Sequence, residues 1–180
     1  MKLDLPPRFK VRPIGPEQTL AGMIAAGEID ALHTARAPST FYSKPDAVKR
    51  LFPDYVEVER EYYRRTKIFP IMHVVAIRRE IYEANRWIAM TLYNAFVEAQ
   101  RRAYRSLRET AAHKAMLPWL VAHVEDAVRE LGEDWWPYGF HGSRHVLDTF
   151  LRYHHEQGLS PRRLRPEDMI APETLEAYKI

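Results

Sequence analysis

The side chains best suited to acid–base or metal chemistry in this chain are its 8 histidines, because an unperturbed imidazole titrates close to neutral pH and also binds metals. His141 and His145 are four residues apart and would share one face of a helix. The sequence gives them no third ligand and no HExxH pattern, so no zinc site is expected there. His154 and His155 are adjacent, point to different faces and are interpreted as surface groups. No metal ligand is therefore assigned.

Arginine provides most of the positive charge of a chain whose formal net charge is +3. Its guanidinium group suits bidentate recognition of carboxylates and phosphates. The basic stretch of residues 101–108 is interpreted as a solvated helix face, with contact to a polyanion as the alternative. The 7 glycines form no Gly-rich phosphate loop. On charge alone, a small anionic ligand is as plausible as nucleic acid, and no nucleic-acid partner is assigned.

The composition, with 46% hydrophobic and 28% charged residues, is that of a globular chain with enough apolar material for a core. Because there are no cysteines, disulfides, thiolate catalysis and cysteine-based zinc sites are excluded. The opening residues, MKLDLPP, have no apolar signal segment, and no run is long enough to cross a bilayer. We therefore expect a cytoplasmic location and no membrane partner.

The elements that must position any functional side chain are mostly helical. A first helix is expected over residues 20–26, with Thr19 as N-cap and Gly27 as the left-handed terminator. A long helix is expected over residues 81–108, with a break near Asn85. Two more are expected over residues 112–131, with Gly132 at the end, and from Ser143 to residue 157. A short helix is expected after Asp46, and residues 55–65 are left unassigned. Pro166 and Pro172 are read as first-turn positions of short helices.

Strands are expected at residues 11–14, 29–32 and 68–77. The last segment, IFPIMHVVAI, is a nearly continuous apolar run of the kind found in a strand buried on both faces. The sequence therefore predicts an α/β fold that is rich in helix. So few strands would not make an independent parallel sheet, which indicates part of a larger sheet.

Several motifs resemble one enzyme family. The pattern LxxMxxxGxIDA of residues 20–31 is similar to an element of periplasmic solute-binding proteins. Longer stretches resemble the 4,5-dihydroxyphthalate decarboxylase family: GEIDALHTARAPSTF (27–41), RLFPDYVEVEREYYRRTKIFPIMHVVAIRRE (50–80), EDWWPYG (133–139) and FLRYHHEQGLSPRRLRPEDMIAPETLEAYKI (150–180). The pieces LFPDY, IFPIMH and PETLEAYKI are specific for this family, whereas the GxIDA element alone is not. Departures occur at residues 85–87 and 140–144.

The resemblance implies the C-terminal part of a two-lobed fold of the periplasmic-binding-protein type. Members of the family are considerably longer than this chain. Residues 1–34 would then be a strand–helix–strand remnant of the second lobe, and residues 35–180 the crossover and the C-terminal part of the first lobe. A homo-oligomer is possible in such an arrangement.

The resemblance also implies a reaction, the cofactor-free decarboxylation of a dihydroxylated aromatic dicarboxylate to protocatechuate and CO2. On this basis His73 is expected to be the acid or base, with His33 as a second candidate. Arg36 is expected to bind a carboxylate and Ser39 to add a hydroxyl hydrogen bond. Tyr138 and Arg144 are expected to line the cleft.

Each of these residues has a structural interpretation as well. A histidine in a buried strand is commonly a hydrogen-bonded core residue, an arginine commonly forms a surface ion pair, and a serine commonly caps a helix or turn. Trp135, Trp136 and Tyr138 are interpreted first as core. A module that binds a small aromatic carboxylate without catalysis, and an inactive fragment, stay open as alternatives.

Overall fold

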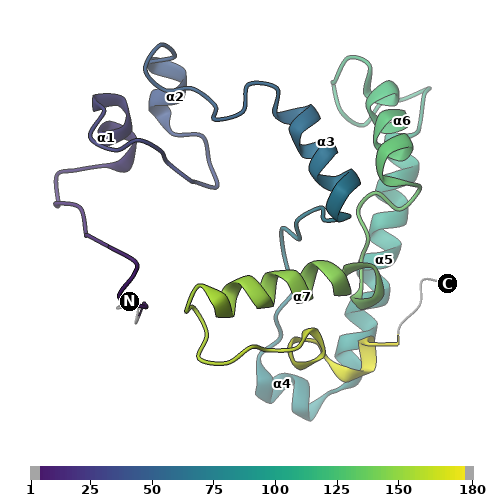
Figure 1. Ribbon diagram of the computed structural model, residues 1–180. Helices are drawn as coiled ribbons and strands as arrows, with labels where there is room; N and C mark the ends of the chain where they lie inside the picture. The colour runs from purple at the N-terminus through teal and green to yellow at the C-terminus, as the bar shows by residue number, and fades with distance from the viewer. Residues whose placement is uncertain (1–4, 177–180) are drawn as a thin grey trace. The chain divides into compact units, whose positions relative to one another are not determined.

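Helices make up the regular structure of residues 5–176, the part of the chain that the computed structural model describes (Figure 1). The chain divides into two compact units, an N-terminal unit of residues 6–66 and a C-terminal unit that comprises the residues from Lys67 onward together with Leu5. Each unit is described by itself below. The boundary near residue 34 expected from the sequence concerned the lobes of a larger fold, and it stays a prediction.

The N-terminal unit opens with α1 (Leu20–Ala26), which begins and ends as the sequence predicts. Thr19 Oγ1 accepts a hydrogen bond of 3.0 Å from the Gly22 amide, which satisfies one of the unpaired amides of the first turn. Gly27 ends the helix in the left-handed conformation, with φ 73°. The next helix, α2 (Ser39–Ser43), contacts α1 through a 3.0 Å hydrogen bond from Thr40 Oγ1 to the carbonyl of Ala21.

The last helix of the N-terminal unit is α3 (Tyr55–Thr66), the segment that the sequence left unassigned. None of its residues is buried. The short helix expected after Asp46 is absent, because residues 45–47 form a turn instead. Arg50 follows this turn, and its guanidinium lies over the rings of Phe41 and Tyr55. Cation–π contacts therefore connect α2 to the start of α3.

The C-terminal unit is built on the long helix α5 (Trp87–Leu107), preceded by α4 (Arg79–Ala84). The predicted break at Asn85 is confirmed, since this residue leaves the helical region with φ −146° and ψ 63°. The other elements are α6 (Leu120–Leu131), α7 (Phe140–Glu156) and the 3-10 helices η1 (Pro166–Met169) and η2 (Pro172–Thr174). Both prolines begin these short helices, as expected.

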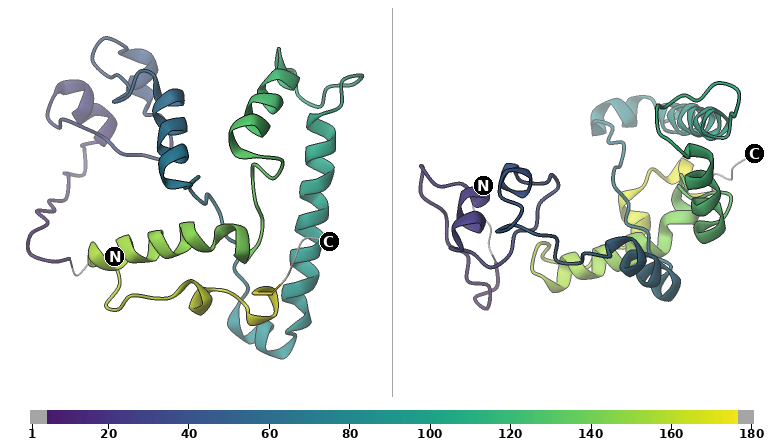
Figure 2. Two further views of the ribbon diagram at one scale, coloured as in Figure 1. Left: turned by 45° about the vertical axis from the view of Figure 1, so that its right-hand side comes forward. Right: turned by 90° about the horizontal axis from the view of Figure 1, so that it is seen from above.

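Within this unit α6 lies beside α5, α7 crosses the direction of α5, and η1 lies against α7 (Figures 1 and 2). The core between them is small: its buried apolar side chains include Ala89, Val97, Leu120, Val124, Phe140 and Leu151. Among the described residues, no side chain is less than 2% exposed. The helices therefore enclose little fully dry interior.

Two helix starts differ from the sequence prediction. The helix expected over residues 112–131 is shorter than predicted, because Trp119 has the left-handed φ of 57° and α6 starts only at Leu120. Ser143 does not cap α7, which already begins at Phe140 after Gly139. Gly132 ends α6 as predicted. In both helices the residue just before the first turn, Trp119 or Gly139, has a positive φ. Helix propensity does not predict this conformation, so the first residue of each helix was misplaced.

The predicted α/β class is wrong, since residues 5–176 contain no strand. The prediction of a helix-rich chain is confirmed. A β-strand is stable only when its amides and carbonyls pair with a neighbour, and residues 69–77 form no hydrogen bond with the rest of the described chain. Residues 11–14 and 29–32 are likewise without a paired strand. Membership of the periplasmic-binding-protein fold stays a prediction.

Membrane-spanning segments were sought in the same residues. None of the helices in residues 5–176 combines the length and the apolar character needed to cross a membrane.

Candidate functional site

A cavity of about 490 Å³ lies within the C-terminal unit. Its walls come from the apolar segment 69–77, from α5, from the loop that precedes α7, from the first turns of α7, and from residues 169–174. This volume lies within the range of about 300–1,000 Å³ that is usual for small-molecule sites. No Lys, Arg, Asp or Glu is among the lining residues. The cavity is therefore suited to an apolar or aromatic group.

His73 is the titratable imidazole in this cavity. It sits at the middle of segment 69–77, and its side chain is exposed rather than buried. Its neighbours in sequence are exposed too, with Met72 at 58% and Val74 at 73%. The interpretation of His73 as a core residue of a buried strand is therefore wrong, because the segment covers one side of the cavity and is open to solvent on the other.

The opposite wall is the aromatic loop of residues 134–139, which contributes Trp136 and Tyr138. Tyr104 of α5 holds this loop: its hydroxyl accepts a 2.9 Å hydrogen bond from the Trp136 amide and donates one of 3.2 Å to Asp134 Oδ1. The Tyr104 ring stacks on Trp135 with ring centroids 4.0 Å apart. Burial is the main cause that raises the pKa of Tyr104 to about 12. The phenol is therefore protonated, and able to donate, throughout the neutral range.

Glycines allow the loop to lie close to α5 and to itself. Gly139 has φ 92°, and a Cβ there would lie 2.9 Å from the Tyr93 hydroxyl oxygen. A Cβ on Gly142 would lie 2.9 Å from Cβ of Pro137. Tyr93 also lines the cavity, and burial is the main cause that raises its pKa. A larger residue at Gly139 or Gly142 would thus displace the wall that carries Tyr138.

The third wall, residues 169–174, is held by one carboxylate. Tyr82 donates a hydrogen bond to Glu173, and Arg86 donates another of 3.2 Å to the same side chain. The hydrogen bond from Tyr82 is the largest cause that lowers the pKa of Glu173. These contacts attach η2 to α4 and to the start of α5. They thereby fix Ala171 and Thr174 at the edge of the cavity.

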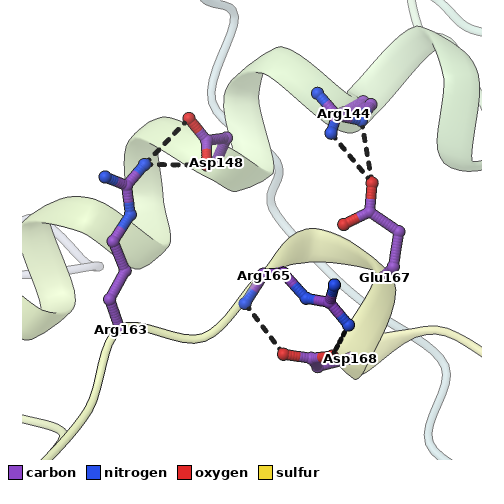
Figure 3. A network of polar contacts seen from close by, with 6 residues as sticks. All are labelled: Arg144, Asp148, Arg163, Arg165, Glu167 and Asp168. Carbon is purple, nitrogen blue, oxygen red and sulfur yellow. Dashed lines mark hydrogen bonds and ion pairs between the residues drawn. The ribbon is translucent and has the colours of Figure 1, made fainter.

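Arg144 lies outside the residues that line the cavity. Its guanidinium donates to Glu167 with N–O distances of 3.0 and 2.9 Å, and Arg163 donates to both oxygens of Asp148 (Figure 3). The pKa of Glu167 is lowered, chiefly by a backbone hydrogen bond and then by the hydrogen bond from Arg144. Both pairs tie the segment 163–167 to α7. In this conformation Arg144 acts structurally, and its role toward a substrate stays a prediction.

His33, Arg36 and Ser39 belong to the N-terminal unit, and all three are exposed. The backbone of Arg36 forms a local turn with Thr34, whose hydroxyl donates to the Arg36 carbonyl at 3.1 Å. Ser39 is the first residue of α2 and does not act as its N-cap, which is Pro38. The structure thus brings His73 and Tyr138 together in one cavity, while the pairing of His33, Arg36 and Ser39 with them stays a prediction.

Several lining residues were missed by the sequence interpretation, chiefly Tyr93, Trp136 and Phe69. Phe69 packs edge-on against Trp136, with ring centroids 5.4 Å apart. Tyr93 comes four residues after Ala89 and three before Phe96, which also line the cavity, so its location on this face of α5 was available from helical spacing. No signal in the sequence indicated that Gln100 and Tyr104, from the polar part of the same helix, support the loop.

Metal binding was examined in the described residues as well. Within residues 5–176, no group of three or more His, Asp or Glu side chains is arranged to hold a metal ion. The pair His141 and His145 therefore has no third ligand from this part of the chain.

Comparison with known proteins gives one informative similarity. The chain is 39% identical over 163 residues to a protein named 4,5-dihydroxyphthalate decarboxylase from Comamonas testosteroni. The match covers 91% of this chain and 49% of the relative, so the chain spans about half the length of that protein. No family model matches the chain. Over nearly its whole length, the chain is therefore similar to about half of a 4,5-dihydroxyphthalate decarboxylase.

Proposed function

We propose that the chain takes part in the cofactor-independent decarboxylation of a dihydroxylated aromatic dicarboxylate, of the kind named in its relative. The observation that carries the proposal is that His73 and Tyr138, both within stretches that resemble the family, line one aromatic cavity. A decarboxylase of this kind needs a water-poor space for a ring and an acid–base group beside it. The 39% identity supports the same reading.

The chemistry follows from the substrate. In 4,5-dihydroxyphthalate each hydroxyl is para to one carboxylate, so removal of a phenolic proton increases electron density at the ipso carbon. Protonation of that carbon breaks aromaticity, and loss of CO2 restores it. We assign the proton transfer at the ipso carbon to the His73 imidazole, with His33 as the second candidate. Tyr138 and Trp136 form the wall for the ring.

Two carboxylates require cationic partners, because an unpaired charge in an apolar site costs several kcal/mol. Within residues 5–176, no Lys or Arg is among the residues that line the cavity. On sequence grounds alone we propose that Arg36 binds a carboxylate and that Ser39 adds a hydrogen bond. Arg144 would contribute only after its guanidinium leaves Glu167. The product of decarboxylation, a monoacid, needs fewer such contacts than the substrate.

The second candidate is a module that binds an aromatic acid without converting it. The absence of charged residues among those that line the cavity favours this function, because such a surface binds a ring well and gives a reacting carboxylate little electrostatic help. The two functions differ in one measurable respect, the release of CO2.

The experiment incubates the chain with 4,5-dihydroxyphthalate and measures CO2 and protocatechuate, with substrate binding followed by calorimetry. We expect His73→Ala to lower turnover by about 100-fold or more, the range for loss of a general acid or base, while binding persists. His113→Ala, on the exposed connection between α5 and α6, is the matched control. Arg36→Ala should raise the KM by roughly tenfold, with Arg12→Ala as its control.

Each outcome decides between the candidates. Binding without CO2 release would establish the binding module and refute the decarboxylase. Turnover that is unchanged in His73→Ala would remove His73 from the mechanism. Neither binding nor turnover by the chain would refute both functions for it.

A further inference from the structure

Two polar side chains of α5 hold the backbone of Trp136 from both sides. The Trp136 amide donates to the Tyr104 hydroxyl at 2.9 Å, and its carbonyl accepts a hydrogen bond from Gln100 Nε2. Gln100 is the buried polar residue of this helix, 6% exposed. Because Gln100 and Tyr104 are one helical turn apart, both hydrogen bonds to Trp136 come from the same face of α5.

The two supports are also joined to each other. Gln100 Nε2 lies 3.4 Å from the Tyr104 hydroxyl, which in turn donates to Asp134. The hydroxyl thus accepts from the backbone of the loop and donates to a side chain of the same loop. Two contacts between α5 and the loop, one with the Trp136 amide and one with Asp134, therefore depend on this one oxygen.

Neither Gln100 nor Tyr104 lines the cavity, whereas Trp136 and Tyr138 do. The Trp136 ring packs against Phe69 at 5.4 Å, so its place sets the gap between the loop and segment 69–77. Tyr138 follows two residues later in the same loop. The location of both rings therefore depends on contacts that a ligand does not touch.

We propose that Tyr104 and Gln100 are positioning residues, which act through Trp136 to set the width of the cavity for a flat aromatic ring. The proposal rests on the proposed function, because it assumes that an aromatic acid is the ligand. Its effect should appear in binding rather than in the chemical step. Without the contacts from Tyr104 and Gln100, the Trp136 ring would occupy a wider range of positions and bind the ligand less well. We expect this loss to be equal in the ground state and the transition state, which raises KM and leaves kcat unchanged.

The first measurement needs no ligand. The chain is labelled with 5-fluorotryptophan, and the four tryptophan signals are recorded by fluorine NMR, with Trp136→Phe assigning the signal of interest. In Tyr104→Phe, which keeps the ring stacked on Trp135, we expect the Trp136 signal to shift or split while the signals of the exposed Trp87 and Trp119 stay unchanged. Tyr153→Phe, on the exposed side of α7, is the control. An unmoved Trp136 signal would overturn the proposal.

The second measurement uses 4,5-dihydroxyphthalate as substrate and protocatechuate as binding probe. Tyr104→Phe and Gln100→Ala should each raise the KM, or the Kd of the probe, on the order of tenfold, the equivalent of one lost hydrogen bond. We expect kcat to change by less than about threefold. Gln157→Ala, at the exposed end of α7, is the control for Gln100, and circular dichroism verifies folding of each variant.

The two proposals fail in different ways. If the unmodified chain neither binds nor converts these compounds while the Trp136 signal moves, the proposed function fails and the supports still position the wall. If the unmodified chain binds the probe and Tyr104→Phe moves the signal but leaves the KM and Kd unchanged, the positioning role toward a ligand is refuted. A fall in kcat with an unchanged KM would also refute it.

Discussion

Two walls of the same cavity are built in different ways. The loop that carries Trp136 and Tyr138 is attached to α5 through Gln100 and Tyr104. Segment 69–77 lies opposite and forms no hydrogen bond with the rest of the described chain. Among the described residues, directional contacts thus fix one wall, and apolar contacts such as that of Phe69 with Trp136 place the other.

The difference shows what each kind of contact can specify. Hydrogen bonds to a loop backbone define its conformation residue by residue, because each has a preferred distance and angle. Hydrophobic contact is non-directional and scales with the area removed from water. Segment 69–77 leaves much of its apolar surface exposed. Changes in the loop should therefore cost more stability than comparable changes in the segment.

The largest effect is expected from Gly139→Ala in the loop. Gly139 has φ 92° and ψ 176°, a conformation used almost only by glycine, and its new Cβ would lie 2.9 Å from the Tyr93 hydroxyl. Strain and overpacking together should lower the free energy of unfolding by about 2–4 kcal/mol. Urea denaturation measures the change.

Gly132→Ala is the matched control for this substitution. Gly132 has nearly the same backbone angles, φ 92° and ψ 178°, but a Cβ there meets nothing within 4 Å. The control should therefore show the backbone strain without the clash. Equal losses for both variants would mean that Tyr93 does not constrain the loop.

An intermediate effect is expected from the titration of Tyr104. Its pKa in the folded chain is raised to about 12 from 10.0, so its contribution to stability is complete below pH 10 and is lost as the pH rises through the folded pKa. At pH 8 Tyr104→Phe should lower the free energy of unfolding by about 1 kcal/mol. The gap between the two proteins should shrink from pH 10 to 12, since phenylalanine does not ionise.

Urea denaturation at several pH values tests this. Other tyrosines with raised pKa values, among them Tyr82 and Tyr93, are present in both proteins and cancel in the comparison. A gap that stays constant to pH 12 would contradict the burial of the Tyr104 hydroxyl, which is the largest cause of its raised pKa.

The smallest effect is expected in the opposite wall. Val74 is 73% exposed, so Val74→Lys should alter the free energy of unfolding by no more than about 0.5 kcal/mol. Val97→Lys on α5 is the contrast, because Val97 is 6% exposed and burial of a lysine there should cost several kcal/mol. A loss above about 1 kcal/mol for Val74→Lys would mean that the segment is packed more firmly than its exposure indicates.

The sequence predicted those parts of the fold that depend on local chemistry. Thr19 and Gly27 delimit α1, and the prolines of η1 and η2 begin their helices, because caps and proline act within one turn of the chain. The starts of α6 and α7 were missed. Each helix follows a residue with positive φ, Trp119 at 57° or Gly139 at 92°, and the apolar spacing that predicted the helices does not reveal this.

Residues 69–77 show why the fold class was wrong. Isoleucine, valine and phenylalanine favour a pleated, half-buried strand, yet the pattern does not supply the neighbour with which a strand must pair. The sequence also failed to reveal which residues of the candidate site contact one another. His73 and Tyr138 were expected near a ligand and do share a cavity, whereas the contact of Arg144 with Glu167 joins residues far apart in sequence and could not be read from either one.

The double attachment of Trp136 also bears on which wall of the cavity moves. With its amide and its carbonyl both bound to α5, the residue can move chiefly by rotation about its side-chain bonds, which takes picoseconds to nanoseconds, whereas displacement of a loop takes nanoseconds to microseconds. Within residues 5–176, no hydrogen bond restrains the backbone of residues 69–77. We therefore expect the backbone of residues 69–77 to move more than the loop that carries Trp136 when the cavity changes its width.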